Sequence, residues 1–182
     1  SQGTDIILCR HLLSHQFPTG TSLTRSFRKT AKSKLHPRNQ HTGGYDFKRL
    51  IKRSPDLVDF TASNLAGHIS IDFSDKHAVR ALNRALLYTH YNIKFWDIPE
   101  NYLCPPIPGR VDYLHYLGDL LALDNNNQVP HGRSIKVLDI GTGANLVYPL
   151  TGQSEYGWSF TGSDIDPAAV KLAQQIAKSN QL

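Results

Sequence analysis

A short run of residues near position 140 has the types and spacing of a cofactor-binding turn. Asp139-Ile-Gly-Thr-Gly143 follows an apolar stretch typical of a β-strand, and Ala144 and Asn145 come directly after it. Gly141 permits a sharp turn, and Gly143 removes a side chain where a ligand must touch the backbone. Ligands of open α/β sheets bind at the carboxyl ends of the strands. We therefore expect Asp139, Gly141, Gly143, Ala144 and Asn145 to line a site for a nucleoside cofactor.

A second acidic residue stands where the ribose of such a cofactor is held. Asp164 ends a stretch that reads as the next strand and lies 21 residues after Gly143. Carboxylates at the end of the second strand accept hydrogen bonds from ribose hydroxyls. Asp166-Pro167 then marks the start of a helix. Alternative roles are a charge favoured by that helix dipole for Asp164, and a carboxylate that caps a helix or braces the loop for Asp139.

The pattern favours S-adenosylmethionine (SAM) over a dinucleotide. A dinucleotide fingerprint requires a third glycine three residues after the second, and position 146 is leucine. SAM carries an ammonium group and no phosphate, so a carboxylate such as Asp139 suits it better than it suits a pyrophosphate. An NAD-dependent enzyme remains the weaker alternative.

The elements that must position these residues form an α/β unit of Rossmann-like type. We expect residues 131–182 to be the start of a Rossmann-like SAM-binding domain, incomplete because it holds only the first two strands. Residues 35–130 are expected to be mainly helical, and residues 1–34, rich in polar and basic residues, to be a disordered basic tail.

Within the helical region, apolar residues recur at helical spacing over 45–53, 75–90 and 111–123. Ser54-Pro55 predicts the start of a further short helix, with serine as its N-cap. Alternation over 69–73 predicts a strand.

Two finer expectations concern the surroundings of these helices. The prolines of 103–110 predict an irregular loop, because proline removes a backbone donor and fixes φ. Arg80 and Arg84 should lie on the solvent side of the helix at 75–90.

Charge is distributed unevenly along the chain. Residues 1–53 carry eleven Lys and Arg against two acids, a net +9, whereas residues 54–182 carry nine against thirteen, a net −4. Such a split indicates a basic surface for a polyanion, with a solvated basic tail as the alternative.

Composition argues against metals and membranes. The two cysteines, Cys9 and Cys104, are far apart and predict neither a disulfide framework nor a zinc site. No apolar run approaches the roughly 20 residues of a membrane span. We expect a cytoplasmic protein without metal, and we expect an incomplete chain because the sequence starts at Ser1 and lacks methionine.

Six motifs in order go beyond this general class and carry a resemblance from Leu35 to the last residue. They are Leu35-His-Pro-Arg-Asn39, Asp97-Ile-Pro, Leu103-Cys-Pro-Pro-Ile-Pro-Gly-Arg-Val-Asp-Tyr113, Asp139-Ile-Gly-Thr-Gly-Ala-Asn145, Tyr148-Pro-Leu and Tyr156-Gly-Trp158. Together they resemble the family of ribosomal RNA large subunit methyltransferase F, which is related to a eukaryotic adenine-N6-methyltransferase of U6 small nuclear RNA. The resemblance implies a class I SAM-dependent methyltransferase that modifies the N6 amine of an adenine in 23S ribosomal RNA.

By this resemblance Asp139, Gly141, Gly143, Ala144 and Asp164 line the SAM site. Arg110 is predicted to bind the SAM carboxylate or an RNA phosphate through its guanidinium fork; an ion pair with Asp112 or Asp119 is the alternative.

Contacts to large-subunit ribosomal RNA are expected from a set of basic and polar residues near the N-terminus. Stacking on unpaired bases is expected from His36, His41 and Tyr45. The residues predicted to bind RNA phosphates are Arg38, Asn39, Lys48, Arg49, Lys52 and Arg53.

One motif of the family is missing from the 182 residues. N6-adenine methyltransferases use an Asn-Pro-Pro-aromatic loop to hold the extruded base, and the sequence has no such run. We therefore expect no catalysis by this chain alone. The alternative function is a non-catalytic RNA-binding module with a vestigial nucleotide-binding fold.

Overall fold

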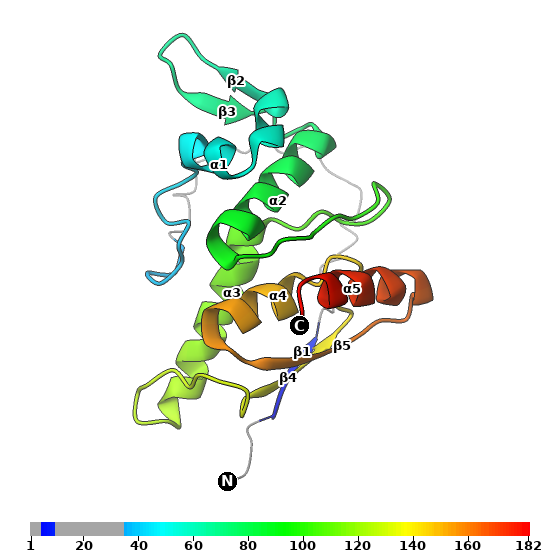
Figure 1. Cartoon of the computed structure of the whole chain (residues 1–182). Coiled ribbons are helices and arrows are strands. Elements are labelled where there is room, and N and C mark those ends of the chain that lie inside the picture. The colour runs from blue at the N-terminus through cyan, green and yellow to red at the C-terminus, as the bar shows by residue number, and fades with distance from the viewer. Residues whose placement is uncertain (1–4, 10–34) are drawn as a thin grey trace, which may run out of the picture.

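The computed structural model describes residues 5–9 and 35–182 and shows a helical part stacked on a parallel sheet (Figure 1). The sheet holds β1 (Asp5–Cys9), β4 (Lys136–Ile140) and β5 (Ser159–Ser163) in the order β1-β4-β5. Both pairings are parallel, with Leu8 opposite Asp139 and Asp139 opposite Gly162.

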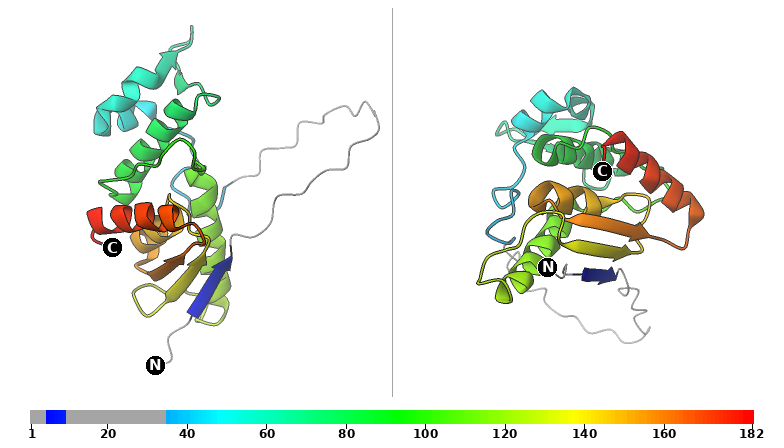
Figure 2. Two further views of the ribbon diagram at one scale, coloured as in Figure 1. Left: turned by 90° about the vertical axis from the view of Figure 1, so that its right-hand side faces the viewer. Right: turned by 60° about the horizontal axis from the view of Figure 1, so that its bottom comes forward.

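Two helices complete this α/β unit. α4 (Val147–Tyr156) connects β4 to β5, and α5 (Pro167–Ser179) follows β5. Both lie on the same side of the sheet (Figure 2). A strand, a helix and a parallel strand form the βαβ unit of nucleotide-binding folds, so the Rossmann-like fold class is confirmed.

The strand β1 corrects one expectation. Residues 5–9 were expected to belong to a disordered tail, and they instead pair along the whole of β4. The physical reason is that an open strand edge presents unpaired N–H and C=O groups that recruit another extended segment. The rest of the expected tail, residues 1–4 and 10–34, lies outside the described residues.

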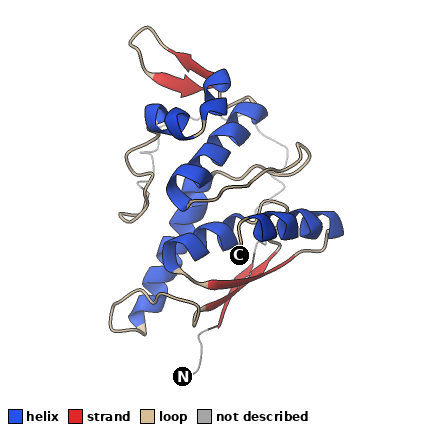
Figure 3. Cartoon of the chain, in the orientation of Figure 1, coloured by secondary structure: helices blue, strands red, loops and turns tan. Residues whose placement is uncertain are grey.

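The helical part contains most of the predicted elements (Figure 3). A helix at 45–53, a short helix after Ser54 and a strand near 69–73 are confirmed, although the side chain of Ser54 makes no capping hydrogen bond. The bounds are α1 (Phe47–Arg53), the 3-10 helix η1 (Pro55–Phe60), β2 (Thr61–Ser63), β3 (Ile69–Ile71), α2 (Lys76–Tyr91) and α3 (Ile107–Leu123). The hairpin partner β2 was not predicted.

Two local expectations were wrong in part. α3 begins at Ile107, inside the stretch expected to be irregular, because proline is tolerated in the first turn of a helix, where its missing donor is not needed. Arg80 and Arg84 do not simply face solvent. Arg80 donates to the carbonyl of Ile98 at 3.0 Å, and Arg84 lies 3.3 Å from the carboxylate of Asp97.

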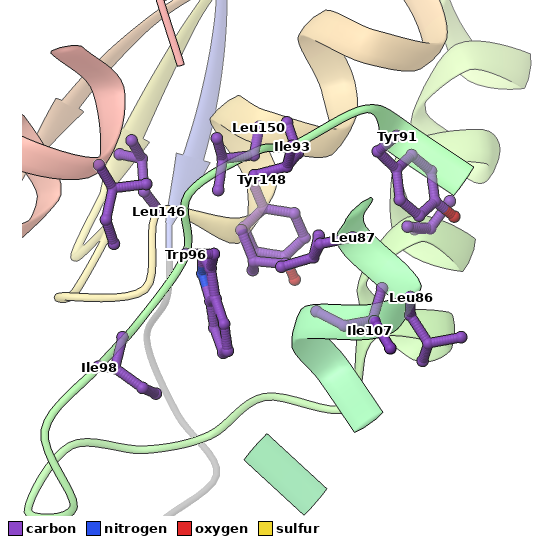
Figure 4. Packing of buried hydrophobic residues seen from close by; sticks show 14 of the residues in the cluster. Leu86, Leu87, Tyr91, Ile93, Trp96, Ile98, Ile107, Leu146, Tyr148 and Leu150 are labelled. Atoms are coloured by element: carbon purple, nitrogen blue, oxygen red, sulfur yellow. The ribbon is translucent and has the colours of Figure 1, made fainter. Parts of the chain in front are cut away.

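One hydrophobic core joins the helical part to the sheet. Trp96 is 2% exposed and packs among side chains from α2, α3 and α4 (Figure 4). Its indole Nε1 donates to the carbonyl oxygen of Asn145 at 2.7 Å. The segment that follows α2 therefore stabilises the predicted cofactor loop through this hydrogen bond.

Among residues 5–9 and 35–182, no helix is both long and apolar enough to cross a bilayer. The same residues contain no group of three or more His, Cys, Asp or Glu arranged to hold a metal ion.

Candidate functional site

The loop after β4 has the backbone that its glycines predict. Gly141 has φ 76° and Gly143 has φ 64°, values that favour glycine. Leu146 also has a positive φ, 50°, just before α4. The amides of Gly141 and Thr142 donate to the carbonyl of Ser163 at 2.8 and 2.9 Å. The loop is thus fastened to the carboxyl end of β5.

Asp164 completes this arrangement. Its Oδ2 accepts a hydrogen bond from the amide of Gly143 at 2.8 Å, and its Oδ1 accepts one from the amide of Asp166 at 3.0 Å. The structure therefore brings the predicted acid and the predicted glycine together. A carboxylate has about four lone-pair sites, so bracing the loop leaves acceptor capacity for two ribose hydroxyls.

Asp139 lies deeper than expected. A carboxylate at an open strand tip was predicted, and the structure buries Asp139 completely, at 0% exposure. Aspartate is almost never buried to this extent unless it is paired. A contact between Asp139 and a ligand ammonium group stays a prediction that requires access to this buried carboxylate.

Ala144 and Asn145 are 1% and 2% exposed and belong to the packed base of the loop. The Oδ1 of Asn145 accepts from the amide of Val147 at 3.2 Å, and its Nδ2 donates to the carbonyl of Leu103 at 3.4 Å. The side chain of Asn145 therefore connects the first turn of α4 to Leu103, in the segment before α3.

Arg110 lies in the first turn of α3, beside the start of α4. Its Nη1 is 3.3 Å from the hydroxyl of Tyr148, and its Nε is buried without a hydrogen-bond partner among the described residues. The alternative ion pair with Asp112 or Asp119 is not observed within that part of the chain. An unsatisfied donor beside the loop fits a ligand carboxylate.

Two residues at the site were missed by sequence reasoning. Ile165, between Asp164 and Asp166, is 101% exposed, and an apolar side chain so placed offers a surface to a flat ligand ring. Tyr102 donates from its hydroxyl to Oδ2 of Asp166 at 2.8 Å. The sequence offered a signal for Ile165, because this apolar residue lies between two aspartates. It offered none for Tyr102, because that contact joins residues 64 positions apart.

Four of the predicted RNA-binding cations share one exposed surface on α1. Lys48, Arg49, Lys52 and Arg53 are all exposed, and none forms an ion pair within the described residues. The guanidinium of Arg53 lies 4.9 Å from the centre of the Tyr88 ring. We call this set the α1 basic face.

Arg38 and Asn39 have a different place. Asn39 is 2% exposed and donates to the carbonyl of Pro108 at 2.9 Å, so its side chain is used inside the protein, and its contact with RNA stays a prediction. Arg38 bonds to Asp119 at 2.7 Å, to the His115 carbonyl at 2.8 Å and to the Tyr156 hydroxyl at 3.3 Å. These bonds occupy its guanidinium and explain why a basic residue here need not meet a phosphate.

The histidines of the same segment are also internal. His36 and His41 are 5% and 3% exposed, so they offer no free ring for base stacking. His36 Nε2 lies 2.8 Å from Asp119, and His41 Nε2 lies 2.8 Å from the Tyr91 hydroxyl. We call residues 36–41 the latch, because they fasten the chain to α2 and α3. Tyr45, beyond the latch, is half-buried and stacks on Phe73.

A family profile described as RNA methyltransferase matches residues 29–182. The chain belongs to this RNA methyltransferase family. Solved members of the fold are similar: the METTL16 MTase domain has 34% identity and a TM-score of 0.72, with 83% of this chain and 57% of that chain covered. The N-terminal domain of human METTL16 in complex with SAH has 33% identity and a TM-score of 0.72, with 81% and 56% covered.

Curated relatives in the RNA methyltransferase family are closer in sequence. Ribosomal RNA large subunit methyltransferase F of Pseudoalteromonas translucida is 65% identical over 153 residues, 84% of this chain and 49% of that protein. The protein of the same name from Pseudomonas savastanoi pv. phaseolicola is 61% identical over 151 residues, 83% of this chain and 46% of that protein. The chain thus spans about half the length of these relatives.

Proposed function

We propose that this member of the RNA methyltransferase family binds SAM at the β4–α4 loop and RNA on the α1 basic face. We further propose that these two binding sites serve methylation of the N6 amine of an adenine in large-subunit ribosomal RNA, in the cytoplasm. The observation that carries the proposal is the hydrogen bond between Asp164 and the amide of Gly143 in a positive-φ loop. The name of the curated relatives and the SAH complex of human METTL16 support the substrate and the cofactor.

Four residues around the β4–α4 loop have a defined task in this proposal. Asp164 holds the ribose hydroxyls with the acceptor capacity that the loop leaves free, and Ile165 packs on the adenine ring. The buried Nε of Arg110 donates to the carboxylate of the amino-acid end, and Asp139 attracts its ammonium group. SAM, when bound, supplies a methyl group on a sulfonium centre.

The α1 basic face supplies affinity for RNA without selecting its sequence. Exposed lysine and arginine side chains bind phosphates and release counterions, which makes binding weaken with salt. The crystal structure of the human METTL16 catalytic domain with a MAT2A 3'UTR hairpin, 33% identical with a TM-score of 0.72, supports RNA as the partner.

Methyl transfer needs more than these two binding sites. An adenine amine must be held by acceptors while its ring is stacked outside the helix, and the 182 residues contain no Asn-Pro-Pro-aromatic run for this task. We therefore propose that these 182 residues alone bind the donor and the RNA but do not transfer the methyl group.

Calorimetric titration of S-adenosylhomocysteine into the chain tests the proposal. Saturable binding that NAD does not compete with is the expected result. RNA binding without any heat from S-adenosylhomocysteine supports the alternative, a non-catalytic RNA-binding module with a vestigial nucleotide-binding fold.

A further inference from the structure

A pocket of about 500 Å³ lies between the turn that enters α2 and the segment 98–104. Phe73 and Leu103 line it and are 56% and 64% exposed. Both side chains therefore offer apolar surface to a ligand in the pocket. None of the residues predicted to bind SAM lines this pocket.

A second hollow, of about 290 Å³, lies between α4, β5 and α5. Of the loop after β4, it reaches Thr142 and Leu146 but neither glycine, and it exposes no cluster of charge. The larger pocket, in contrast, is lined by several charged side chains as well as by aromatic ones.

The lining of the larger pocket combines aromatic rings with positive charge. Lys76 is exposed and forms no ion pair within the described residues, while His77 lies 3.6 Å from Glu100, the one acid in the lining. Arg80 also lines the pocket, but its Nη1 donates to the Ile98 carbonyl at 3.0 Å and its Nε lies 3.8 Å from the carboxylate of Asp97, so Lys76 is the cation left for a ligand phosphate. Aromatic side chains beside cations are the means by which proteins bind unpaired nucleotides.

The position of the pocket connects it to the donor site. Tyr102 and Leu103 line one side of the pocket. The same two residues also contact the loops that form the proposed SAM site. The Tyr102 hydroxyl bonds to Asp166 at 2.8 Å, and Asn145 bonds to the Leu103 carbonyl at 3.4 Å. A ligand in the pocket is therefore separated from the SAM site by a single segment of chain.

One lining residue, Phe73, contacts the segment just before α1. The Phe73 ring stacks on Tyr45 with centroids 6.2 Å apart and planes 28° apart. Tyr45 lies two residues before α1, which carries the α1 basic face. The Tyr45 and Phe73 rings therefore lie between the α1 basic face and the lining of the pocket in the sequence of contacts.

We propose that this pocket binds an unpaired nucleotide next to the methylated one, with its base against Phe73 and its phosphate at Lys76. The proposal rests on the RNA-binding function proposed above and adds a specific place to it. Because Phe73 and Lys76 are exposed, both can be changed without disturbing the core.

The test measures the affinity of the chain for a short unstructured RNA of adenine and uracil by fluorescence anisotropy. Phe73→Ala should weaken binding by between about 5-fold and about 100-fold, the loss expected from one base–aromatic contact. Its salt dependence should stay unchanged, whereas Lys76→Ala should flatten the salt slope by about one ion. Phe73→Trp should keep the affinity of the parent.

Leu65→Ala is the matched control, because Leu65 is 110% exposed in the turn between β2 and β3, outside the pocket. Equal affinities for Phe73→Ala, Leu65→Ala and the parent would overturn the pocket, even if charge reversal on α1 still weakens binding. A parent chain that does not bind the RNA at all would overturn the RNA-binding function and the pocket together.

Discussion

At the scale of single residues, one carboxylate holds the site together. Asp164 accepts two backbone hydrogen bonds and connects the loop after β4 to the loop after β5. Its place beside the glycine loop was predictable from spacing, since acids at the end of a second parallel strand recur in nucleotide-binding sheets, whereas its contact with a ribose stays a prediction. The burial of Asp139 was not predictable, because it depends on side chains that pack against the strand from other elements.

Asp164→Ala should weaken binding of S-adenosylhomocysteine about 10-fold to 100-fold, because charged hydrogen bonds contribute about 1.5 to 3 kcal/mol. It should also lower the free energy of unfolding by about 1 kcal/mol, since the amide of Gly143 loses its partner. Calorimetry and urea unfolding measure the two effects. Asp59→Ala, an exposed aspartate on η1, is the control and should change neither.

Arg38 is the residue whose role changed most between sequence and structure. Beside other basic residues it resembles a phosphate ligand, yet its partners Asp119, His115 and Tyr156 lie about 80 to 120 positions along the chain. Local patterns contain no information about such long-range partners.

Replacing Arg38 by alanine should lower the free energy of unfolding by about 2 kcal/mol, because several charged hydrogen bonds are lost and their buried partners remain. RNA affinity should stay near that of the parent. Arg49→Ala, an exposed arginine without an ion pair in the described residues, should show the reverse pattern. If both variants lost RNA affinity equally and kept their stability, Arg38 would bind RNA and would not fasten the latch to α3.

At the scale of elements, hydrophobic periodicity predicted the helices well. The stripes over 45–53, 75–90 and 111–123 became α1, α2 and α3, because an amphipathic helix must bury one face. β1 could not be predicted, since its pairing with β4 joins the two strands across most of the chain.

The helix α1 carries the clearest test of RNA binding at this scale. Simultaneous charge reversal at Arg49, Lys52 and Arg53 should lower RNA affinity at least 10-fold and flatten the dependence of affinity on salt, because about three phosphate contacts are lost. Binding of S-adenosylhomocysteine should be unchanged. Anisotropy at several salt concentrations measures the slope, and an unaltered slope would remove α1 from the RNA-binding surface.

At the scale of the whole molecule, the continuous core makes the helical part and the sheet depend on each other. Two buried histidines belong to this framework. Burial lowers the pKa of His41 to about 4, assisted by the charges of His90 and His115. Burial likewise lowers the pKa of His115 to about 4, assisted by His36 and Arg38.

These shifts predict a loss of stability in mild acid. The unfolded chain takes up protons near pH 6.5 and the folded chain only near pH 4, so stability is complete above pH 6.5 and falls as pH drops toward 4. By pH 5 the loss should be about 2 kcal/mol for each histidine. Urea unfolding at pH 7 and pH 5 measures it, and His41→Gln should halve the difference. A free energy of unfolding that is the same at both pH values would contradict these shifts.

The account depends most on a methyl donor that rests on the glycine loop and is held by Asp164. A nuclear magnetic resonance titration of the ¹⁵N-labelled chain with S-adenosylhomocysteine tests this directly, because even weak binding shifts the amide signals nearby. We predict shifts concentrated at Gly141, Gly143, Asp164 and Ile165. Shifts that avoid these four amides, or none at saturating ligand, would contradict the site.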